Sequence, residues 1–214
     1  MRRRAAILIS GRGSNMAALI DAARDPDYPA EIALVLANRA DAAGLGLAEQ
    51  AGIATCVIAH KPFGRDRAAH EAALDATLGA FGIELVCLAG YMRLLTPFLV
   101  ERWKGRMLNI HPSLLPAFPG LNTHARALEA GVKLHGCTVH LVTEATDEGP
   151  IVAQAAVPVL ADDTEALLAS RVLAQEHRIY PLALSLLAAG SAAAVPAAPD
   201  CCLLNPLPAS RRLP

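Results

Sequence analysis

The chain has 214 residues, of which 19 are Lys or Arg and 20 are Asp or Glu. This near balance, without a long run of either sign, argues against a general nucleic-acid or membrane-surface binder, although selective binding of a small anion remains possible. The length supports one domain with a full hydrophobic core. We therefore expect small-molecule partners, no nucleic acid and no membrane.

The cysteines form neither a CxxC pair nor a zinc-finger spacing, and they are Cys56, Cys87, Cys137, Cys201 and Cys202. Buried free thiols in a reducing cytoplasm are the simplest interpretation. The basic start, Arg2-Arg3-Arg4, precedes an apolar run of about six residues, which is shorter than the apolar region of a signal peptide. We predict a cytoplasmic protein that is not exported.

Strand-like apolar runs alternate with helical stretches in the first half of the chain. The expected strands cover residues 5–10, 32–37, 55–59 and 85–89, and the expected helices cover residues 15–24, 42–51, 65–80 and 96–102. This alternation predicts a parallel, doubly wound α/β sheet.

The second half of the chain is expected to extend this sheet. It contains a short strand at residues 107–110, a helix at 123–130, and two extended runs at 137–143 and 151–159 that can pair as an antiparallel extension. A long helix over residues 163–187 follows, with Asp162-Asp163-Thr164 as its N-cap signal and Gly190 as its end. We expect one α/β catalytic domain over residues 1–190, with a mostly parallel sheet, and an Ala/Pro-rich tail over residues 191–214.

Polar segments follow several of these strands, so they should meet at the carboxyl edge of the sheet. The first is Gly11-Arg12-Gly13-Ser14-Asn15, where glycines permit positive φ and a helix N-terminus attracts an anion. The loop predicts a phosphate cradle, since it lacks both the third glycine of a dinucleotide fingerprint and the Lys of a Walker loop. A tight turn capped by Ser14 or Asn15 is the structural alternative.

The strongest chemical signal is Asn109-Ile110-His111-Pro112. Prolines end regular structure after this strand, and period-two alternation places Asn109 and His111 on one face. A carboxamide beside an imidazole supplies an oxyanion donor and a proton carrier, as acyl transfer to an amine requires. Asp147, if the fold brings it to the ring, would orient the imidazole and keep it protonated; taken alone, it is a turn residue.

The other histidines lack such a setting, and a structural or exposed role is expected for His60, His70, His124, His135 and His177. His135 and Cys137 share one strand face while His140 faces away, so these three residues fail as a metal cage. No HExxH sequence occurs, and we expect no metal.

Taken in order, these segments resemble those of the glycinamide ribonucleotide transformylases, the folate-dependent formyltransferases of purine synthesis. The likeness runs over residues 5–187 and includes Ser10 to Asn15, Ala37-Asn38-Arg39-Ala40-Asp41-Ala42, Leu88 to Leu95, Asn109 to Pro116, Pro119-Gly120-Leu121-Asn122-Thr123-His124 and Gln175-Glu176-His177. The ordered set is far more specific than any single segment.

The resemblance implies a formyltransferase-like variant of the Rossmann fold, with 10-formyltetrahydrofolate as co-substrate and glycinamide ribonucleotide as acceptor. The catalytic residues that it implies are Asn109, His111 and Asp147. The implied ribonucleotide contacts are Gly13, Ser14, Asn15 and Glu176, and the implied folate contacts are Arg67, Met92, Arg93, Leu94, Leu95, Asn109 and Val142.

Several alternatives remain open. Arg65 competes with Arg67, because the run after Phe63 is one residue longer than the family pattern, and Glu176 would otherwise lie on a solvated helix face. Asn122 stands where the family usually has a histidine, and the tail lacks the family's polar ending. The oligomeric state is left as monomer or homodimer.

The expected reaction is direct attack of the ribonucleotide amine on the formyl group, without a covalent nucleophile from the protein. Formyltetrahydrofolate hydrolase and methionyl-tRNA formyltransferase share the Asn-x-His-Pro-Ser core, but both usually carry a further domain. The alternative that is not an enzyme is a nucleotide-binding module built on the same sheet.

Overall fold

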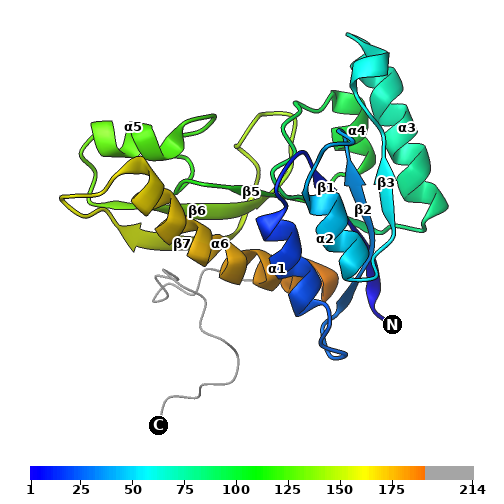
Figure 1. Cartoon of the computed structure of the whole chain (residues 1–214), viewed down its shortest axis with the longest axis horizontal. Helices are drawn as coiled ribbons and strands as arrows, with labels where there is room; N and C mark the ends of the chain where they lie inside the picture. Colours follow the sequence, from blue (N-terminus) through cyan, green and yellow to red (C-terminus); the bar gives the residue numbers. More distant parts are fainter. Residues whose placement is uncertain (191–214) are drawn as a thin grey trace.

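The computed structural model describes residues 1–190, which form a single seven-stranded sheet with helices on both faces (Figure 1). The strand order is β3-β2-β1-β4-β5-β6-β7. The strands are β1 Arg3–Ile9, β2 Ala30–Ala37, β3 Thr55–Val57, β4 Leu85–Leu88, β5 Met107–His111, β6 Leu134–Leu141 and β7 Ile151–Pro158. The α-helices are α1 Ser14–Ala22, α2 Gly44–Gln50, α3 Arg67–Ala80, α4 Pro97–Arg102, α5 Thr123–Glu129 and α6 Glu165–Ala188, and a short 3-10 helix, η1, covers Lys61–Phe63.

The predicted α/β class and its antiparallel extension are confirmed. Strands β1 to β5 pair in parallel, whereas β5–β6 and β6–β7 are antiparallel. The boundaries differ by a few residues where pairing or capping decides them. Strand β6 begins at Leu134 because Leu134 still pairs with Pro158 of β7, and α3 begins at Arg67 because the Asp66 side chain accepts from the Ala69 N–H.

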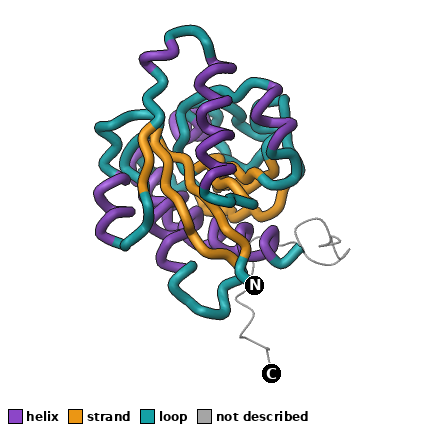
Figure 2. Tube along the Cα trace, turned by 90° about the vertical axis from the view of Figure 1, so that its right-hand side faces the viewer, coloured by secondary structure: helices purple, strands orange, loops and turns teal. Residues whose placement is uncertain are grey.

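Two hydrophobic layers hold the helices against the sheet, and Figure 2 shows helices on both sides of the twisted strands. Met16 and Leu19 of α1, Leu45 of α2 and Leu184 of α6 belong to the larger cluster. Leu74 and Leu78 of α3 pack with Leu99 of α4 in the cluster on the other side. The central strands β1 and β4 are buried on both faces, which explains why they read as continuous apolar runs, whereas the edge strands β3 and β7 are partly exposed.

The order of the strands places a crevice at the carboxyl ends of β1 and β4. From β1, the chain builds one side of the sheet through β2 and β3, and it then returns to the other side of β1 to form β4 and β5. Ligands bind at such a switch point in open α/β sheets. The glycine loop follows β1 and residues 90–95 follow β4, so the segments predicted to bind ligands do meet at this edge.

Helix α6 also fixes the ends of the strands that carry the site. Tyr180 is fully buried, and its hydroxyl lies 3.0 Å from the Leu88 carbonyl and 3.3 Å from the Leu108 carbonyl. These carbonyls belong to β4 and to the residue before Asn109 in β5. Helix α6 thus anchors β4 and β5 next to Asn109.

The predicted cap of α6 is confirmed, because the Thr164 side chain accepts from the Leu167 N–H. Within residues 1–190, no helix combines the length and hydropathy needed to cross a membrane. The predicted tail over residues 191–214 lies outside the described residues.

We predict that Tyr180→Phe lowers the free energy of unfolding by about 1–3 kcal/mol, because it leaves a buried strand carbonyl without its donor. Tyr28→Phe is the matched control: the Tyr28 hydroxyl also donates to a backbone carbonyl, that of Pro181, but its side chain is only partly buried and water can replace it. Urea unfolding of both variants provides the measurement. Equal losses would contradict the anchoring role of Tyr180.

Candidate active site

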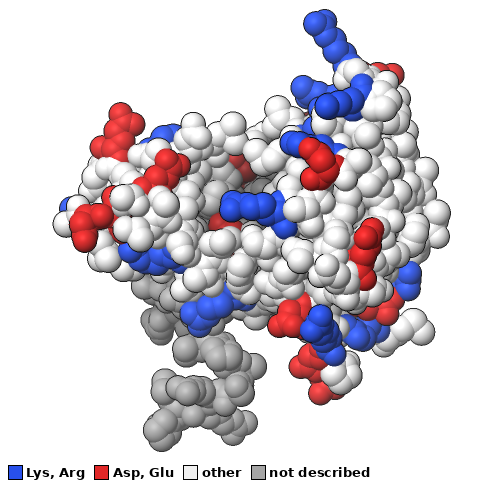
Figure 3. Space-filling model, in the orientation of Figure 1, with Lys and Arg blue, Asp and Glu red and all other residues white. Residues whose placement is uncertain are grey.

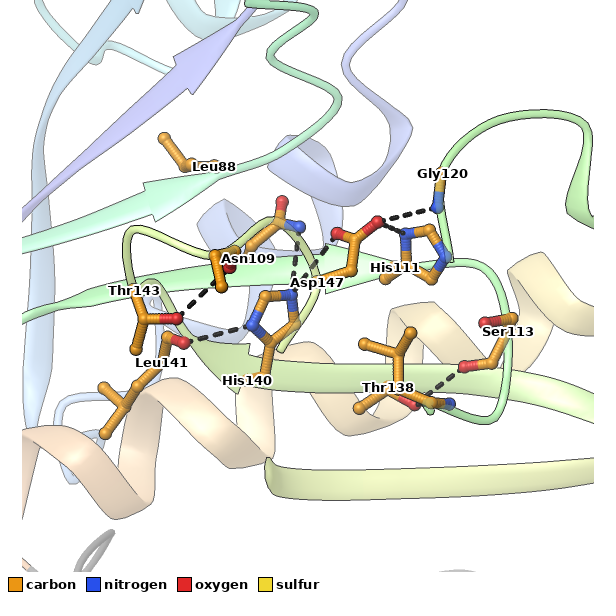
Figure 4. Close-up of polar contacts among 12 residues, drawn as sticks. Leu88, Asn109, His111, Ser113, Gly120, Thr138, His140, Leu141, Thr143 and Asp147 are labelled. Atoms are coloured by element: carbon orange, nitrogen blue, oxygen red, sulfur yellow. Dashed lines mark hydrogen bonds and ion pairs between the residues drawn. The ribbon is translucent and has the colours of Figure 1, made fainter. Parts of the chain in front are cut away.

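The Asp147 carboxylate lies at the centre of the candidate site (Figure 4). One oxygen, Oδ2, is 3.4 Å from Nδ1 of His111 and accepts a hydrogen bond of 2.8 Å from the Gly120 N–H. The other, Oδ1, is 3.9 Å from Nε2 of His140. The Asp147 side chain is only 8% exposed, so its charge depends on these neighbours instead of on water.

Two loops bring these groups together. Residues 112–122 follow β5 and supply Gly120, and residues 142–150 connect β6 to β7 and supply Asp147. Asp147 has a φ of 60°, a left-handed conformation that Asp tolerates better than most residues. As an isolated turn residue, it would fold its carboxylate onto its own backbone. The carboxylate instead bonds across to the other loop, so this interpretation is wrong and the proximity to His111 is confirmed.

Both ring nitrogens of His111 face oxygen acceptors. Nε2 lies 3.1 Å from the Phe118 carbonyl, and because a carbonyl only accepts, this nitrogen carries a hydrogen. Nδ1 faces the Asp147 carboxylate at 3.4 Å, slightly beyond the usual hydrogen-bond length. The ring is 6% exposed, so these two acceptors are its main polar partners.

His140 belongs to the site, although its role was not predicted. Its Nδ1 lies 3.0 Å from the Leu141 carbonyl and carries a hydrogen, so Nε2 accepts from Nδ2 of Asn109 at 3.2 Å. Burial lowers the pKa of His140, opposed by the Leu141 carbonyl and by Asp147. The ring is therefore neutral at neutral pH and orients the Asn109 carboxamide.

The missed signal was the register of the antiparallel pair. Asn109 of β5 stands directly opposite His140 of β6. The sequence indicated both strands but not their alignment, and alternation within β6 showed only that His140 points away from His135 and Cys137.

The hydroxyls and thiols of this region are poorly suited to covalent catalysis. Ser113 and Thr138 are fully buried and already donate to the carbonyls of Ala117 and Ser113. Burial raises the pKa of the Cys87 thiol to about 12 and also raises that of Cys137. Cys56, Cys87 and Cys137 are free, and the latter two are buried as expected; Cys201 and Cys202 lie outside the described residues.

The glycine loop places a helix N-terminus beside a buried carboxylate. Gly13 is the N-cap of α1 with a φ of 78°, and a Cβ at this position would approach the Gly44 Cα to 3.0 Å. Neither Ser14 nor Asn15 caps the helix through its side chain, so the predicted cap is wrong, although the loop does form a tight turn between β1 and α1. Asn15 Nδ2 instead donates to Glu176 Oε2 at 2.6 Å.

Glu176 does not lie on a solvated helix face. It is 7% exposed, and burial raises the pKa of its carboxyl while the hydrogen bond from Asn15 opposes the rise. The buried Oδ1 of Asn15 has no hydrogen-bond partner within residues 1–190. Within this range, Asn15 thus keeps one unpaired acceptor beside the buried carboxylate of Glu176.

The segment after β4 exposes apolar side chains at the edge of the sheet. Met92 and Leu94 are 65% and 60% exposed, which is high for residues of this type. Leu95 and Val142 are partly buried and pack against the same hydrophobic cluster. This cluster thus joins the segment after β4 to the start of the loop after β6. Such a surface suits a flat, largely apolar ring system.

Cationic side chains surround the switch point. A cavity of about 500 Å³ is lined by Ser10, Gly11, Arg12, Asn38, Arg39, His60, Gly90, Met92 and Arg93. Arg39 is paired with Asp41, whereas Arg12 and Arg93 form no ion pair within residues 1–190. Figure 3 shows a hollow in the middle of this face, with Asp or Glu atoms inside it and Lys or Arg side chains beside it.

Three further positions from the sequence analysis, Arg65, Arg67 and Asn122, lie at the edges of the site. Arg67 is the first residue of α3 and Arg65 lies in the loop before it; neither guanidinium forms an ion pair within residues 1–190. Asn122 is exposed, has a φ of 55° and precedes α5 without capping it through its side chain. Within the same range, no group of three or more His, Cys, Asp or Glu side chains is arranged to hold a metal ion.

Two packed histidines support the loop that follows His111, residues 112–122. His135 is 1% exposed and packs edge-on against His124 and Phe118, with ring centroids 5.2 and 5.8 Å apart. Burial lowers the pKa of His135 to about 4, and it also lowers that of His124. Since a histidine in the unfolded chain has a pKa of about 6.5, the unfolded state binds more protons between that pH and about 4.

We therefore predict that stability is full above about pH 6.5 and falls as the pH drops through this window. His135→Phe removes one of the histidines whose pKa is lowered and keeps an aromatic ring, so it should lose less stability than the wild type between about pH 7.5 and pH 5. Urea unfolding at both pH values tests this, each protein being compared with itself. An equal loss in both proteins would contradict the assignment.

Comparison with known proteins identifies relatives of this chain. Residues 3–184 match the family described as formyl transferase. The chain is 47% identical to the phosphoribosylglycinamide formyltransferase of Escherichia coli, over 86% of each chain. It is 52% identical to the human trifunctional purine biosynthetic protein adenosine-3 over 89% of this chain, but it spans only 19% of the length of that relative.

Solved structures show the same fold. The phosphoribosylglycinamide formyltransferase of Brucella melitensis superposes with a TM-score of 0.85 at 60% identity, covering 89% of this chain and 97% of that one. Glycinamide ribonucleotide transformylase 1 of Symbiobacterium toebii gives a TM-score of 0.85 at 51% identity, over 88% and 89% of the two chains. The chain therefore belongs to the formyl transferase family, within the group of the phosphoribosylglycinamide formyltransferases.

Proposed function

We propose that this chain transfers the formyl group of 10-formyltetrahydrofolate to the amine of glycinamide ribonucleotide, a step of purine synthesis. The observation that carries the proposal is the buried arrangement of His111, Asp147 and Asn109 at one end of a strand. It supplies an acid, a carboxylate and an amide donor without a covalent nucleophile. Membership of the family narrows the transferred group to a formyl group.

The ribonucleotide is assigned to the glycine loop. The N-terminus of α1 at Gly13 and Ser14 would bind the phosphate through backbone N–H groups. Asn15 and Glu176 would accept hydrogen bonds from the ribose hydroxyls, for which the unpartnered Oδ1 of Asn15 is available. This placement directs the amine toward Asn109 and Asp147.

The formyl donor is assigned to the apolar surface of residues 92–95 and Val142. The exposed side chains of Met92 and Leu94 suit the ring system, and the backbone of Arg93 to Leu95 offers polar groups to its edge. Arg67, or Arg65 in its place, would meet the donor's carboxylates. Both ligands must be bound together for direct attack, so the two half-sites share one cleft.

In the reaction, the amine nitrogen forms a bond to the formyl carbon and the formyl oxygen gains negative charge. The remaining N–H of the Asn109 carboxamide donates a hydrogen bond to this oxygen. The Nδ1–H of His111 does so as well, because at 3.4 Å from Asp147 its hydrogen can be shared between the carboxylate and the formyl oxygen. The bond from the carbon to the folate nitrogen then breaks. Asp147, directly or through a water, carries the proton lost by the amine to that nitrogen.

The same proposal includes the surroundings of the enzyme. We assign it small-molecule substrates only, no bound metal, and a cytoplasmic location in which Cys56, Cys87 and Cys137 stay reduced. The catalytic domain is taken as residues 1–190. Whether the enzyme acts as a monomer or a homodimer does not affect this mechanism, because all of the proposed contacts lie within one chain.

Release of tetrahydrofolate, measured with and without the ribonucleotide, tests the proposal. We expect release only when both ligands are present, and His111→Ala should reduce it by roughly 10²–10⁴. Release without the ribonucleotide would indicate a hydrolase. Binding of the ribonucleotide without any release would indicate a nucleotide-binding module.

We further predict that Ser14→Asp weakens the ribonucleotide at least about 10-fold more than the folate, because it places a carboxylate where the phosphate is expected to bind. Ala72→Asp adds the same charge at an exposed position of α3 and serves as the control. Calorimetric titration of both ligands gives the comparison. Equal weakening of both ligands by Ser14→Asp would assign the loop a structural role only.

A further inference from the structure

Residues 90–96 are held at two points by side chains from distant elements. The Met92 N–H donates to Oγ of Ser10, which follows β1, at 2.8 Å. At the other end, the Thr96 N–H donates to the Glu71 carboxylate at 2.8 Å, and the Thr96 hydroxyl donates to the second carboxylate oxygen. The backbone between these points is thus fixed, although Met92 and Leu94 project into solvent.

Glu71 is a buried carboxylate without a cationic partner. It is 2% exposed, and within residues 1–190 its hydrogen bonds come from Thr96 alone and it forms no ion pair. Burying a carboxylate is costly, and an apolar side chain of similar size often gives an equally stable protein. Positioning of residues 90–96 therefore explains the contact between Glu71 and Thr96 better than a gain in stability does.

The face of α3 that carries Glu71 links three parts of the molecule. Arg67, Glu71 and Asp75 follow at four-residue spacing and so lie on one side of the helix. Arg67 is the candidate partner of the donor's carboxylates, and Glu71 holds Thr96. Asp75 accepts from the indole N–H of Trp103, after α4, at 3.0 Å.

We propose that Glu71 is a positioning residue for the formyl-donor site. It fixes the end of the donor segment, residues 92–95, relative to Arg67 on the preceding turn of the same helix. It acts through the backbone of Thr96 and does not touch the substrate. The assignment rests on the proposed function, because the donor surface is itself proposed.

Glu71→Leu tests this role, since it keeps a similar volume and removes both contacts to Thr96. The KM for the formyl donor should rise about 10-fold, the scale of a lost hydrogen bond to a charged group, while kcat and the KM for the ribonucleotide stay within about twofold. Glu71→Gln should recover most of the loss, because its carbonyl accepts the Thr96 N–H and its amide donates to the hydroxyl.

Asp75→Leu is the matched control on the same helix face. It breaks the ion pair with Arg102 and the contact to Trp103, the single tryptophan of the chain, so it should change the indole emission and leave the donor KM unchanged. Glu71→Leu should do the reverse. If both variants raise the donor KM equally, or if Glu71→Leu raises the KM of both ligands together, Glu71 has only a general structural role and the proposal is wrong.

Amide hydrogen exchange of the ligand-free protein separates this proposal from the proposed function. Exchange at residues 92–96 should be faster in Glu71→Leu than in Asp75→Leu, whatever substrate the protein uses; equal rates would overturn the positioning role. If Glu71→Leu does not fold, Thr96→Val removes the hydroxyl contact alone and should give a smaller rise in donor KM, about threefold. A wild-type protein that releases no tetrahydrofolate would refute only the proposed function.

Discussion

The buried carboxylate of Asp147 is the constraint on which the site depends. A carboxylate with 8% exposure keeps its charge only if neighbouring donors replace water, and the Gly120 N–H and the His111 ring do so. The same contacts join the loop after β5 to the loop after β6. Asn109 is oriented separately, by a neutral His140 that lies beside the same carboxylate. The Asp147 charge therefore organises His111 and the two loops, while His140 orients the amide donor.

The sheet determines where this group can meet its ligands. The switch point between β1 and β4 gathers the glycine loop and the donor segment at one edge, and the antiparallel pairing of β5 with β6 brings Asn109 opposite His140. Tyr180 anchors the strand carbonyls on the far side. The parallel strands thus carry the proposed binding surfaces, and the antiparallel pairing of β5 with β6 completes the proposed catalytic group.

The sequence was sufficient to predict structure and site residues where they depend on local pattern. Apolar runs bounded by glycine and proline identified the strands, and Asn109 and His111 followed from a strand that ends at Pro112. It was insufficient where a contact depends on register or on loop conformation. His140 joins the site only through its pairing with Asn109, and Glu71 holds Thr96 only because α3 packs beside α4. Asp147 was placed near His111 through family resemblance, since nothing in Asp-Glu-Gly-Pro itself indicates the partner.

The most direct test of this account is the protonation of His111 in the folded enzyme, followed by NMR in the wild type and in Asp147→Asn together with the transfer rate. The variant keeps size and hydrogen bonding but removes the charge. We expect the His111 ring to be doubly protonated at neutral pH in the wild type and to lose this proton in the variant, with a parallel fall in the transfer rate. A large fall in rate with unchanged protonation of His111 would contradict the coupling and would leave Asp147 as a residue that holds water or shapes the donor loop.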